Sequence, residues 1–194
     1  MKPDDANSIL SFLREAEALK DVLRSGHTAS GKRESTAEHS WRLCLAAIVV
    51  GRQVQPAVNM ERLLQLCIIH DLGELYCGDT PAIDQTANDG RDVREAEGFA
   101  RLIAHLPAGD RRYFQDLFDD YNAGHTPEAK LAKGLDKLET ILQHTQGKNA
   151  PDFDYGFNLD YGRQWTDLTP EVSALRALVD GETERLAGAQ SKDA

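Results

Sequence analysis

The sequence predicts an all-α fold in which several helices pack into one compact bundle. Apolar residues recur at helical spacing along most of the chain, and no segment shows the alternation of a half-buried strand. Residues 43–50 and 63–72 are apolar on nearly every side, which is typical of helices in the middle of a bundle. The 194 residues suit one domain with a sizeable core. We therefore expect a single domain over residues 1–188, with its core at about 34–146, and a frayed tail at 189–194.

The first predicted helix begins at a cap formed by Asn7 or Ser8 and runs to about Arg24. Its apolar residues form one stripe at helical spacing, so the helix should lie on the surface of the bundle. Gly26 follows the helix closely, and a polar loop over residues 27–34 comes next.

A capping box starts the second helix. In Ser35-Thr36-Ala37-Glu38 the serine hydroxyl can accept from the backbone N–H three residues on, and the glutamate can reach back. This start places His39 in the first turn of a central helix. The third helix has its own cap at Asn59 and runs to about Leu72, so His70-Asp71 lies close to its end.

Loops and helices alternate through the rest of the chain. The clearest start signal is Thr126-Pro127, an N-cap followed by proline at the first helical position. The expected segments are a polar loop at 83–91, helices at about 92–106, 110–121, 127–146 and 170–186, and an aromatic-rich ordered loop at 147–165 that covers the core.

Composition and charge exclude several classes of function. The formal net charge of −10 disfavours binding to nucleic-acid polymers and to anionic membranes, because both carry negative charge. No apolar run approaches the ~18 residues of a membrane-spanning helix, and the first residues show no signal-peptide pattern. Cys44, Cys67 and Cys77 lie without CxxC spacing, so we expect reduced, packed thiols in a cytoplasmic protein.

Four residues stand out as candidate metal ligands, although each has an ordinary alternative. His39 could be a buried histidine satisfied by a neighbouring carbonyl. His70 could be a helix C-terminal histidine that the helix dipole favours, but Asp71 is disfavoured there. Asp136 could be a surface carboxylate between two lysines, Lys133 and Lys137.

Taken together, these residues supply two imidazoles and two carboxylates from three helices. Mixed nitrogen and oxygen ligands suit a divalent ion such as Zn²⁺, Mn²⁺, Co²⁺, Fe²⁺ or Ni²⁺ better than Mg²⁺, which prefers oxygen ligands. Four protein ligands leave room for a water molecule and a substrate oxygen. An ion of this kind lowers the pKa of bound water and polarises a phosphoryl group.

Three blocks of sequence resemble the HD-domain metal-dependent phosphohydrolases, and within them the HD-domain 5′-deoxynucleotidase group. The blocks read RESTAEHSWR at 33–42, HDLGE at 70–74 with GDTP at 78–81, and EAK at 128–130 with LDKLE at 135–139. The resemblance implies an all-α bundle of the HD-domain type. It also implies one divalent metal ion held by His39, His70, Asp71 and Asp136.

The same resemblance implies Glu74 as an acid/base or water-orienting group and Asp79 as a residue near the substrate. Glu74 would share a helical face with His70 if the helix continued that far. A phosphate substrate needs cations, and Arg24 and Arg33 are the candidates at the two ends of the loop. His27 stands where the group commonly has tryptophan, so we include it among the substrate-binding candidates.

The leading prediction is a phosphohydrolase that removes the 5′-phosphate from nucleoside monophosphates, deoxynucleotides in particular, through attack of metal-bound water on phosphorus. One alternative is another phosphate ester or a nucleotide pyrophosphate bond, and another is a non-catalytic nucleotide-binding helical domain. The resemblance also implies a homodimer. We expect His105, His125 and His144 to be surface or loop residues and the aromatic rings of 155–165 to serve packing.

Overall fold

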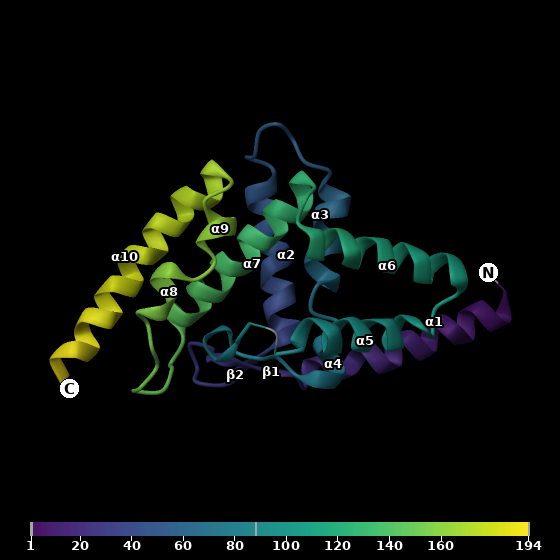
Figure 1. Cartoon of the computed structure of the whole chain (residues 1–194), viewed down its shortest axis with the longest axis horizontal. Helices are drawn as coiled ribbons and strands as arrows, with labels where there is room; N and C mark the ends of the chain where they lie inside the picture. The colour runs from purple at the N-terminus through teal and green to yellow at the C-terminus, as the bar shows by residue number, and fades with distance from the viewer. Residues whose placement is uncertain (1, 88, 194) are drawn as a thin grey trace.

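The computed structural model describes residues 2–87 and 89–193, with side chains to residue 190. It confirms the all-α class and adds one short hairpin (Figure 1). The α-helices are α1 (Pro3–Ala16), α2 (Thr36–Gly51), α3 (Met60–Ile69), α4 (Glu74–Cys77), α5 (Arg91–Ile103), α6 (Ala108–Ala123), α7 (Pro127–Gln146), α8 (Phe157–Asp160), α9 (Arg163–Thr166) and α10 (Pro170–Asp193). The 3₁₀ turns and strands are η1 (Glu17–Lys20), β1 (Leu23–His27), β2 (Arg33–Ser35) and η2 (Ala82–Asp84).

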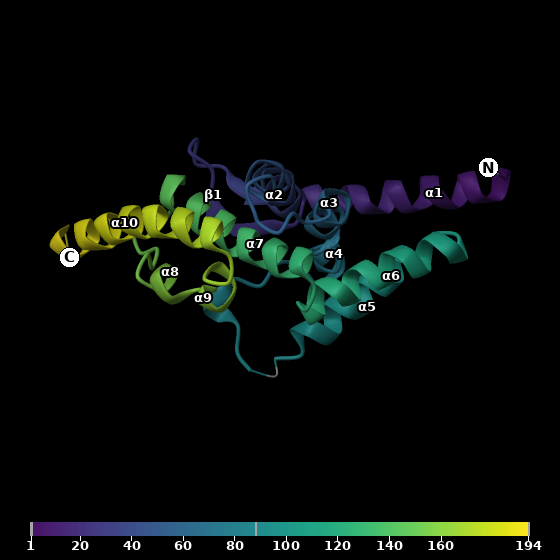
Figure 2. The same cartoon turned by 90° about the horizontal axis from the view of Figure 1, so that it is seen from above.

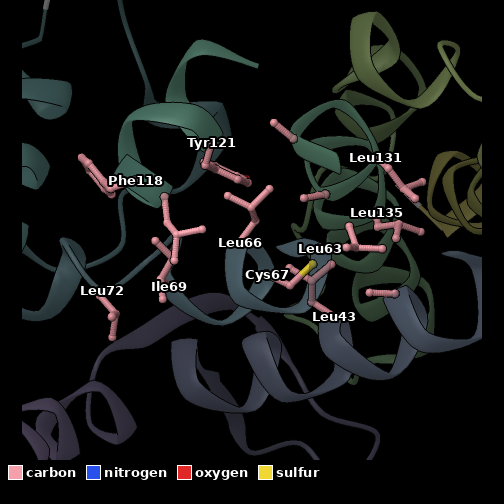
Figure 3. Packing of buried hydrophobic residues seen from close by; sticks show 14 of the residues in the cluster. Leu43, Leu63, Leu66, Cys67, Ile69, Leu72, Phe118, Tyr121, Leu131 and Leu135 are labelled. Atoms are coloured by element: carbon pink, nitrogen blue, oxygen red, sulfur yellow. The ribbon is translucent and has the colours of Figure 1, made fainter. Parts of the chain in front are cut away.

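The core lies where α2, α3 and α7 meet, so the central position predicted for α2 and α3 is confirmed, but burial on every side is wrong for α2, where Leu45, Ile48 and Val49 are exposed. These three helices pack against one another in the middle of the molecule, and α6 covers α3 and α7. Figure 3 shows Leu43, Leu63 and Leu135 gathered between them, all fully buried. The predicted helix starts are confirmed at the Ser35 capping box, at Asn59 and at Thr126. This rigid centre carries the residues that sequence analysis singled out.

The predicted first helix is wrong at both ends. It is capped at Lys2 and ends at Ala16, and Arg24 lies on β1, which pairs antiparallel with β2. The hairpin holds no run of alternating apolar residues that would have revealed it. Its stability comes from contacts with α7, where the Gln143 side-chain amide donates to the His27 carbonyl at 2.5 Å. Strand formation here is decided by tertiary packing.

The third helix also ends earlier than predicted, at Ile69, and a turn leads into α4. The turn passes very close to α5. A Cβ on Gly73 would lie 2.4 Å from the Glu95 carbonyl oxygen, and one on Gly98 would lie 2.4 Å from the Gly73 carbonyl oxygen. Only glycine permits this approach. As a result His70 is the C-cap of α3 and Asp71 lies in the turn.

The C-terminal part forms a layer on α7, and the predicted covering loop contains α8 and α9. Both α9 and α10 pack on α7 (Figures 1 and 2). The fully buried Arg176 ties this layer together, because its guanidinium bonds Asp180 and the carbonyls of Asn158, Leu159 and Tyr161.

Three further expectations can be compared with the structure. The last helix continues to Asp193, so the tail expected to fray from residue 189 is helical as far as it is described, and Ala194 lies outside the described residues. The domain bounds stay a prediction. The three thiols are free, and the prediction of packing is wrong for Cys77, which is exposed. None of the described helices is both long and apolar enough to cross a membrane.

Candidate metal centre

The four predicted ligands come together at the centre of the bundle. His39 lies in the first turn of α2, His70 and Asp71 at the end of α3, and Asp136 in the middle of α7. Ligand atoms of His39, His70 and Asp136 all lie within 4.8 Å of one another. His39 Nε2 is 3.2 Å from Asp136 Oδ1, and His70 Nε2 is 3.0 Å from Asp71 Oδ2.

The hydrogen bonds of both imidazoles fit metal ligation. His39 Nδ1–H donates to Glu139 Oε2, and His70 Nδ1–H donates to the Cys67 carbonyl at 2.9 Å. Each ring therefore turns Nε2 toward the centre, where its lone pair would bind a divalent ion once the proton is lost, as in metal-binding histidines. His39 Nε2, His70 Nε2 and Asp71 Oδ2 are buried without a hydrogen-bond partner. Buried polar atoms rarely stay unpaired, so these three fit a divalent ion.

The charges of the cluster also favour a cation. Burial lowers the pKa of His70, but the negative charges of Asp71 and Asp136 outweigh burial and raise that pKa to about 10. Burial would raise the pKa of Asp71, yet the positive imidazoles and Arg24 bring it down to about 2. The carboxylates of Asp71 and Asp136 therefore stay ionised. Their negative charge favours a positive charge between them, either protons on the imidazoles or a metal ion.

Glu74 lies beside the cluster, but it arrives there through a turn. Since α3 ends at Ile69, the expected continuous helical face does not exist, and Glu74 is the first residue of α4. Thr36 Oγ1 donates to Glu74 Oε2 at 3.1 Å. Burial and the nearby charges of Asp71 and Asp79 raise the pKa of Glu74 to about 9.

Arg24 enters the site from β1. Its Nη1 is 3.5 Å from Asp71 Oδ2 and 3.8 Å from Asp79 Oδ1, and its Nη2 donates to Thr140 Oγ1 at 3.0 Å. Burial alone would lower the pKa of Arg24, but the carboxylates led by Asp79 raise it. Arg24 is therefore a permanent, nearly buried cation next to the proposed metal ligands.

The other two substrate-binding candidates lie elsewhere. Arg33 is exposed, and its guanidinium donates to the carbonyls of Leu23 and Arg24 on the outside of the hairpin. His27 is held through its backbone by Gln143 and Asn149. Neither side chain belongs to the described lining of the cavity that opens from the metal centre.

That cavity has a volume of about 950 Å³, which is in the range of small-molecule sites. One wall is α7, and the opposite walls are residues 79–85 and the segment 150–165. In Figure 2 the connection from α4 to α5 lies on the same side of α7 as α8 and α9. The cavity therefore runs along α7 from Lys133 to His144, and Asp136 lies between these two residues with the other candidate ligands beside it.

Comparison with known proteins agrees with this geometry. An HD-domain family model matches residues 16–176. The chain belongs to the HD-domain family. Human 5′-deoxynucleotidase HDDC2 is 31% identical over 143 residues, which cover 73% of this chain and 69% of the human protein. The 5′-deoxynucleotidase hdd1 of Schizosaccharomyces pombe is 30% identical and covers 70% of both chains. A crystal structure of a predicted metal-dependent phosphohydrolase from Magnetospirillum magnetotacticum has a TM-score of 0.77 and 27% identity, with 94% of each chain covered.

Several residues that line this cavity are not expected there from the sequence. Lys137 Nζ lies 2.9 Å from Asp136 Oδ2, and Lys133 Nζ lies over the rings of Tyr121 and Trp165. Burial and the neighbouring Lys137 lower the pKa of Lys133 to about 8. Both lysines line the cavity, so they are more than surface partners of Asp136.

One expectation about the cavity is also wrong. His144 is half-buried and lines the cavity, where we expected a surface residue. Tyr161 and Trp165 also line the cavity, together with Phe153 and Phe157, and they lie beside Lys137 and Lys133; the expectation that this aromatic segment serves packing stays a prediction. The sequence does contain a signal for His144. It follows Asp136 by eight residues, and this spacing places both side chains on one face of a helix.

Proposed function

We propose that this HD-domain protein removes the 5′-phosphate from nucleoside monophosphates, with deoxynucleotides as the preferred class. The observation that carries the proposal is the convergence of four ligand atoms, three of them buried and unpaired, beside a cavity of about 950 Å³. The names of the human and fission-yeast relatives support the same reaction.

His39, His70, Asp71 and Asp136 would hold one divalent ion, and the donor set suits Zn²⁺, Mn²⁺, Co²⁺, Fe²⁺ or Ni²⁺. Such an ion, when bound, polarises the phosphoryl group and makes a water molecule acidic enough to attack phosphorus. The chain's own residues do the rest, by placing the phosphate, balancing its charge and moving protons.

Proton transfer falls to Glu74 and Asp79. As water attacks phosphorus, the bond to the 5′ oxygen breaks, and that oxygen must gain a proton. Burial and the charges of Asp71 and Asp79 raise the pKa of Glu74 to about 9 in the metal-free protein, and burial, the first of these causes, also acts when an ion is bound. Glu74 can therefore donate to the leaving oxygen. Burial also raises the pKa of Asp79, which suits an acceptor for the proton of water.

Arg24 and Lys137 balance the charge of the phosphate. Arg24 reaches the centre from β1, and Lys137 reaches it from α7 beside Asp136. The burial of Lys137 lowers its pKa, but Asp136 outweighs burial and raises it, so the ammonium stays charged. Two cations that face one site from different elements can contact separate phosphate oxygens in the transition state.

A homodimer and a cytoplasmic location complete the proposal. Trp41, Leu45, Ile48 and Val49 form an exposed apolar face on α2, with Trp41 62% and Val49 66% exposed. Contiguous apolar residues on a surface favour association with a second protein surface. Sedimentation of the purified chain, compared with Trp41→Glu, tests the dimer, and the variant should sediment as a monomer.

The reaction is tested by a screen of metals against nucleotides in which released phosphate and pyrophosphate are measured separately. We expect phosphate from nucleoside 5′-monophosphates and no pyrophosphate from triphosphates. His70→Ala should lose bound metal and turnover together, whereas His125→Ala, at an exposed position, should keep both. Turnover by metal-stripped His70→Ala would contradict the proposal.

A further inference from the structure

One face of α7 follows the cavity from the candidate metal ligands toward the C-terminal end of the helix. Asp136, Thr140 and His144 follow one another at intervals of four residues and all line it. At 1.5 Å per residue, His144 lies about 12 Å along the helix from Asp136. Thr140, between them, accepts from Arg24 Nη2 at 3.0 Å. The three positions correspond in order to the phosphate, the sugar and the base of a nucleotide that starts at the metal centre.

His144 is a neutral hydrogen-bond acceptor at the far end. Its Nδ1–H donates to Asn158 Oδ1 at 3.1 Å, so the lone pair is on Nε2. Burial lowers the pKa of His144 to about 4, which keeps the ring neutral at pH 7. No hydrogen bond to Nε2 occurs among the residues that the structure describes.

The imidazole is held in place on two sides. The Phe153 ring packs edge-on against it, with centroids 4.7 Å apart. On the other side lies β1: a Cβ on Gly26 would be 3.2 Å from His144 Cδ2 and 3.5 Å from Nε2, so the missing side chain of glycine leaves space beside the acceptor atom. A ring that is fixed by Asn158 and Phe153 presents its acceptor in one direction, and this is what selective recognition requires.

Charge is distributed unevenly along the cavity. Arg24, Lys133 and Lys137 lie near the candidate metal ligands, where they offset the carboxylates of Asp71, Asp79 and Asp136, whereas the described lining around Phe153 carries the carboxylates Asp152 and Asp154 and no lysine or arginine. The phosphate therefore belongs near the candidate metal ligands. The far end offers acceptors, and a ligand group that donates hydrogen bonds is favoured there.

We propose that His144 reads the nucleobase: its Nε2 accepts a hydrogen bond from an exocyclic amino group, so the enzyme prefers amino-bearing bases such as adenine. This inference rests on the proposed nucleotidase function and adds base selectivity to it. The metal centre lies about two helical turns away and is not altered by the identity of residue 144.

The test compares two substrates that differ by one group. These are 2′-deoxyadenosine 5′-monophosphate and the 5′-monophosphate of purine 2′-deoxyriboside, which lacks the amino group. We expect the wild type to favour the first about tenfold in kcat/KM, the effect of about one hydrogen bond. His144→Leu should remove this preference, His144→Gln should retain part of it, and the matched control His125→Leu should leave it unchanged.

A second measurement does not depend on hydrolysis. The affinities of the two nucleosides without phosphate, measured by calorimetry, should follow the same order. The wild type should bind 2′-deoxyadenosine more tightly, and His144→Leu should bind both nucleosides equally. If the wild type hydrolyses neither monophosphate, the proposed function fails, and this binding comparison still decides the inference. Equal binding of the two nucleosides by the wild type, or an equal loss for both in His144→Leu, would overturn the role of His144.

Discussion

Replacing Glu139 by glutamine should weaken metal binding while the chain stays folded. Glu139 lies on α7 almost one turn beyond Asp136 and is 3% exposed. His39 Nδ1–H donates to its Oε2, and Arg42 Nε donates to its Oε1 at 2.5 Å. The carboxylate thus fixes the tautomer of His39, and its charge makes Nε2 a better ligand.

The magnitude follows from what glutamine keeps and what it removes. Glutamine preserves the volume and one acceptor oxygen for His39, but it takes away the negative charge between His39 and Arg42. Outer partners of metal-bound histidines contribute about 10–100-fold to metal affinity. Because one hydrogen bond survives, we expect the lower end, a tenfold loss or about 1.4 kcal/mol. Glu139→Ala should also cost about 1–3 kcal/mol of stability, because buried donors lose their acceptor.

Metal affinity can be measured by competition with a metal-sensitive dye, and thermal melting reports whether each variant is folded. Glu184→Gln, at an exposed position of α10, is the matched control and should bind metal as the wild type does. If Glu139→Gln melts normally and binds metal with unchanged affinity, the carboxylate does not tune His39, and the reasoning is refuted.

Three further predictions concern Glu74, the arginines and the aromatic cover. Because burial and neighbouring carboxylates raise the pKa of Glu74 from 4.5 to about 9, metal-free protein should lose stability as the pH rises between these values. In the presence of a chelator, Glu74→Gln should therefore have a higher melting temperature than the wild type at about pH 8 and the same melting temperature at about pH 4. Equal melting temperatures at pH 8 would contradict this prediction. Arg24→Ala should raise KM for a nucleotide about 10–100-fold through lost charged hydrogen bonds. Arg33→Ala should leave KM unchanged. Equal effects of the two substitutions on KM would contradict the placement of Arg24 inside the site and of Arg33 outside it. Gly162→Ala should lower the free energy of unfolding by about 1–3 kcal/mol, because φ at this position is +70° and the new Cβ would lie 2.6 Å from Lys137. An unchanged melting temperature would contradict this prediction.

The helices and the candidate metal ligands are predictable from the sequence because their signals are local. The Ser35 capping box and the Asn59 cap fix two helix starts with residues three apart in sequence, and both occur in the structure. The central position of α2 and α3 follows from segments that are apolar all round. With the helices placed, His39 and His70 had to face the interior.

The hairpin was not predictable in the same way. Its strands are short, lack apolar alternation, and are held by side chains of α7 more than 100 positions later in the chain, such as Gln143 and Thr140. Arg24 was expected near the metal and does lie near it, but on a strand where a helix end was expected. A close tertiary contact decided the local structure, which propensity alone does not reveal.

The far end of the cavity depends on packing that no motif encodes. The aromatic segment folds back over α7 because Arg176 ties its carbonyls to α10 and because Gly162 lets it approach Lys137. Only this return brings Asn158 to His144. No residue near His144 in the sequence indicates this contact, so the sequence alone predicts a surface position for it.

The arrangement along α7 separates chemistry from selectivity. Asp136 contacts His39 directly and Glu139 accepts from its Nδ1–H, both in the middle of α7, while His144 lies about 12 Å from Asp136, near the C-terminal end of the same helix. Since α7 is packed by α2, α3, α6 and α10, its register cannot shift without disturbing the core. A substitution at 144 should therefore change which base is preferred and leave metal affinity and the reaction with an amino-free substrate intact. Loss of metal affinity in folded His144→Leu would show that the two sites are coupled and that the helix does not act as a rigid spacer.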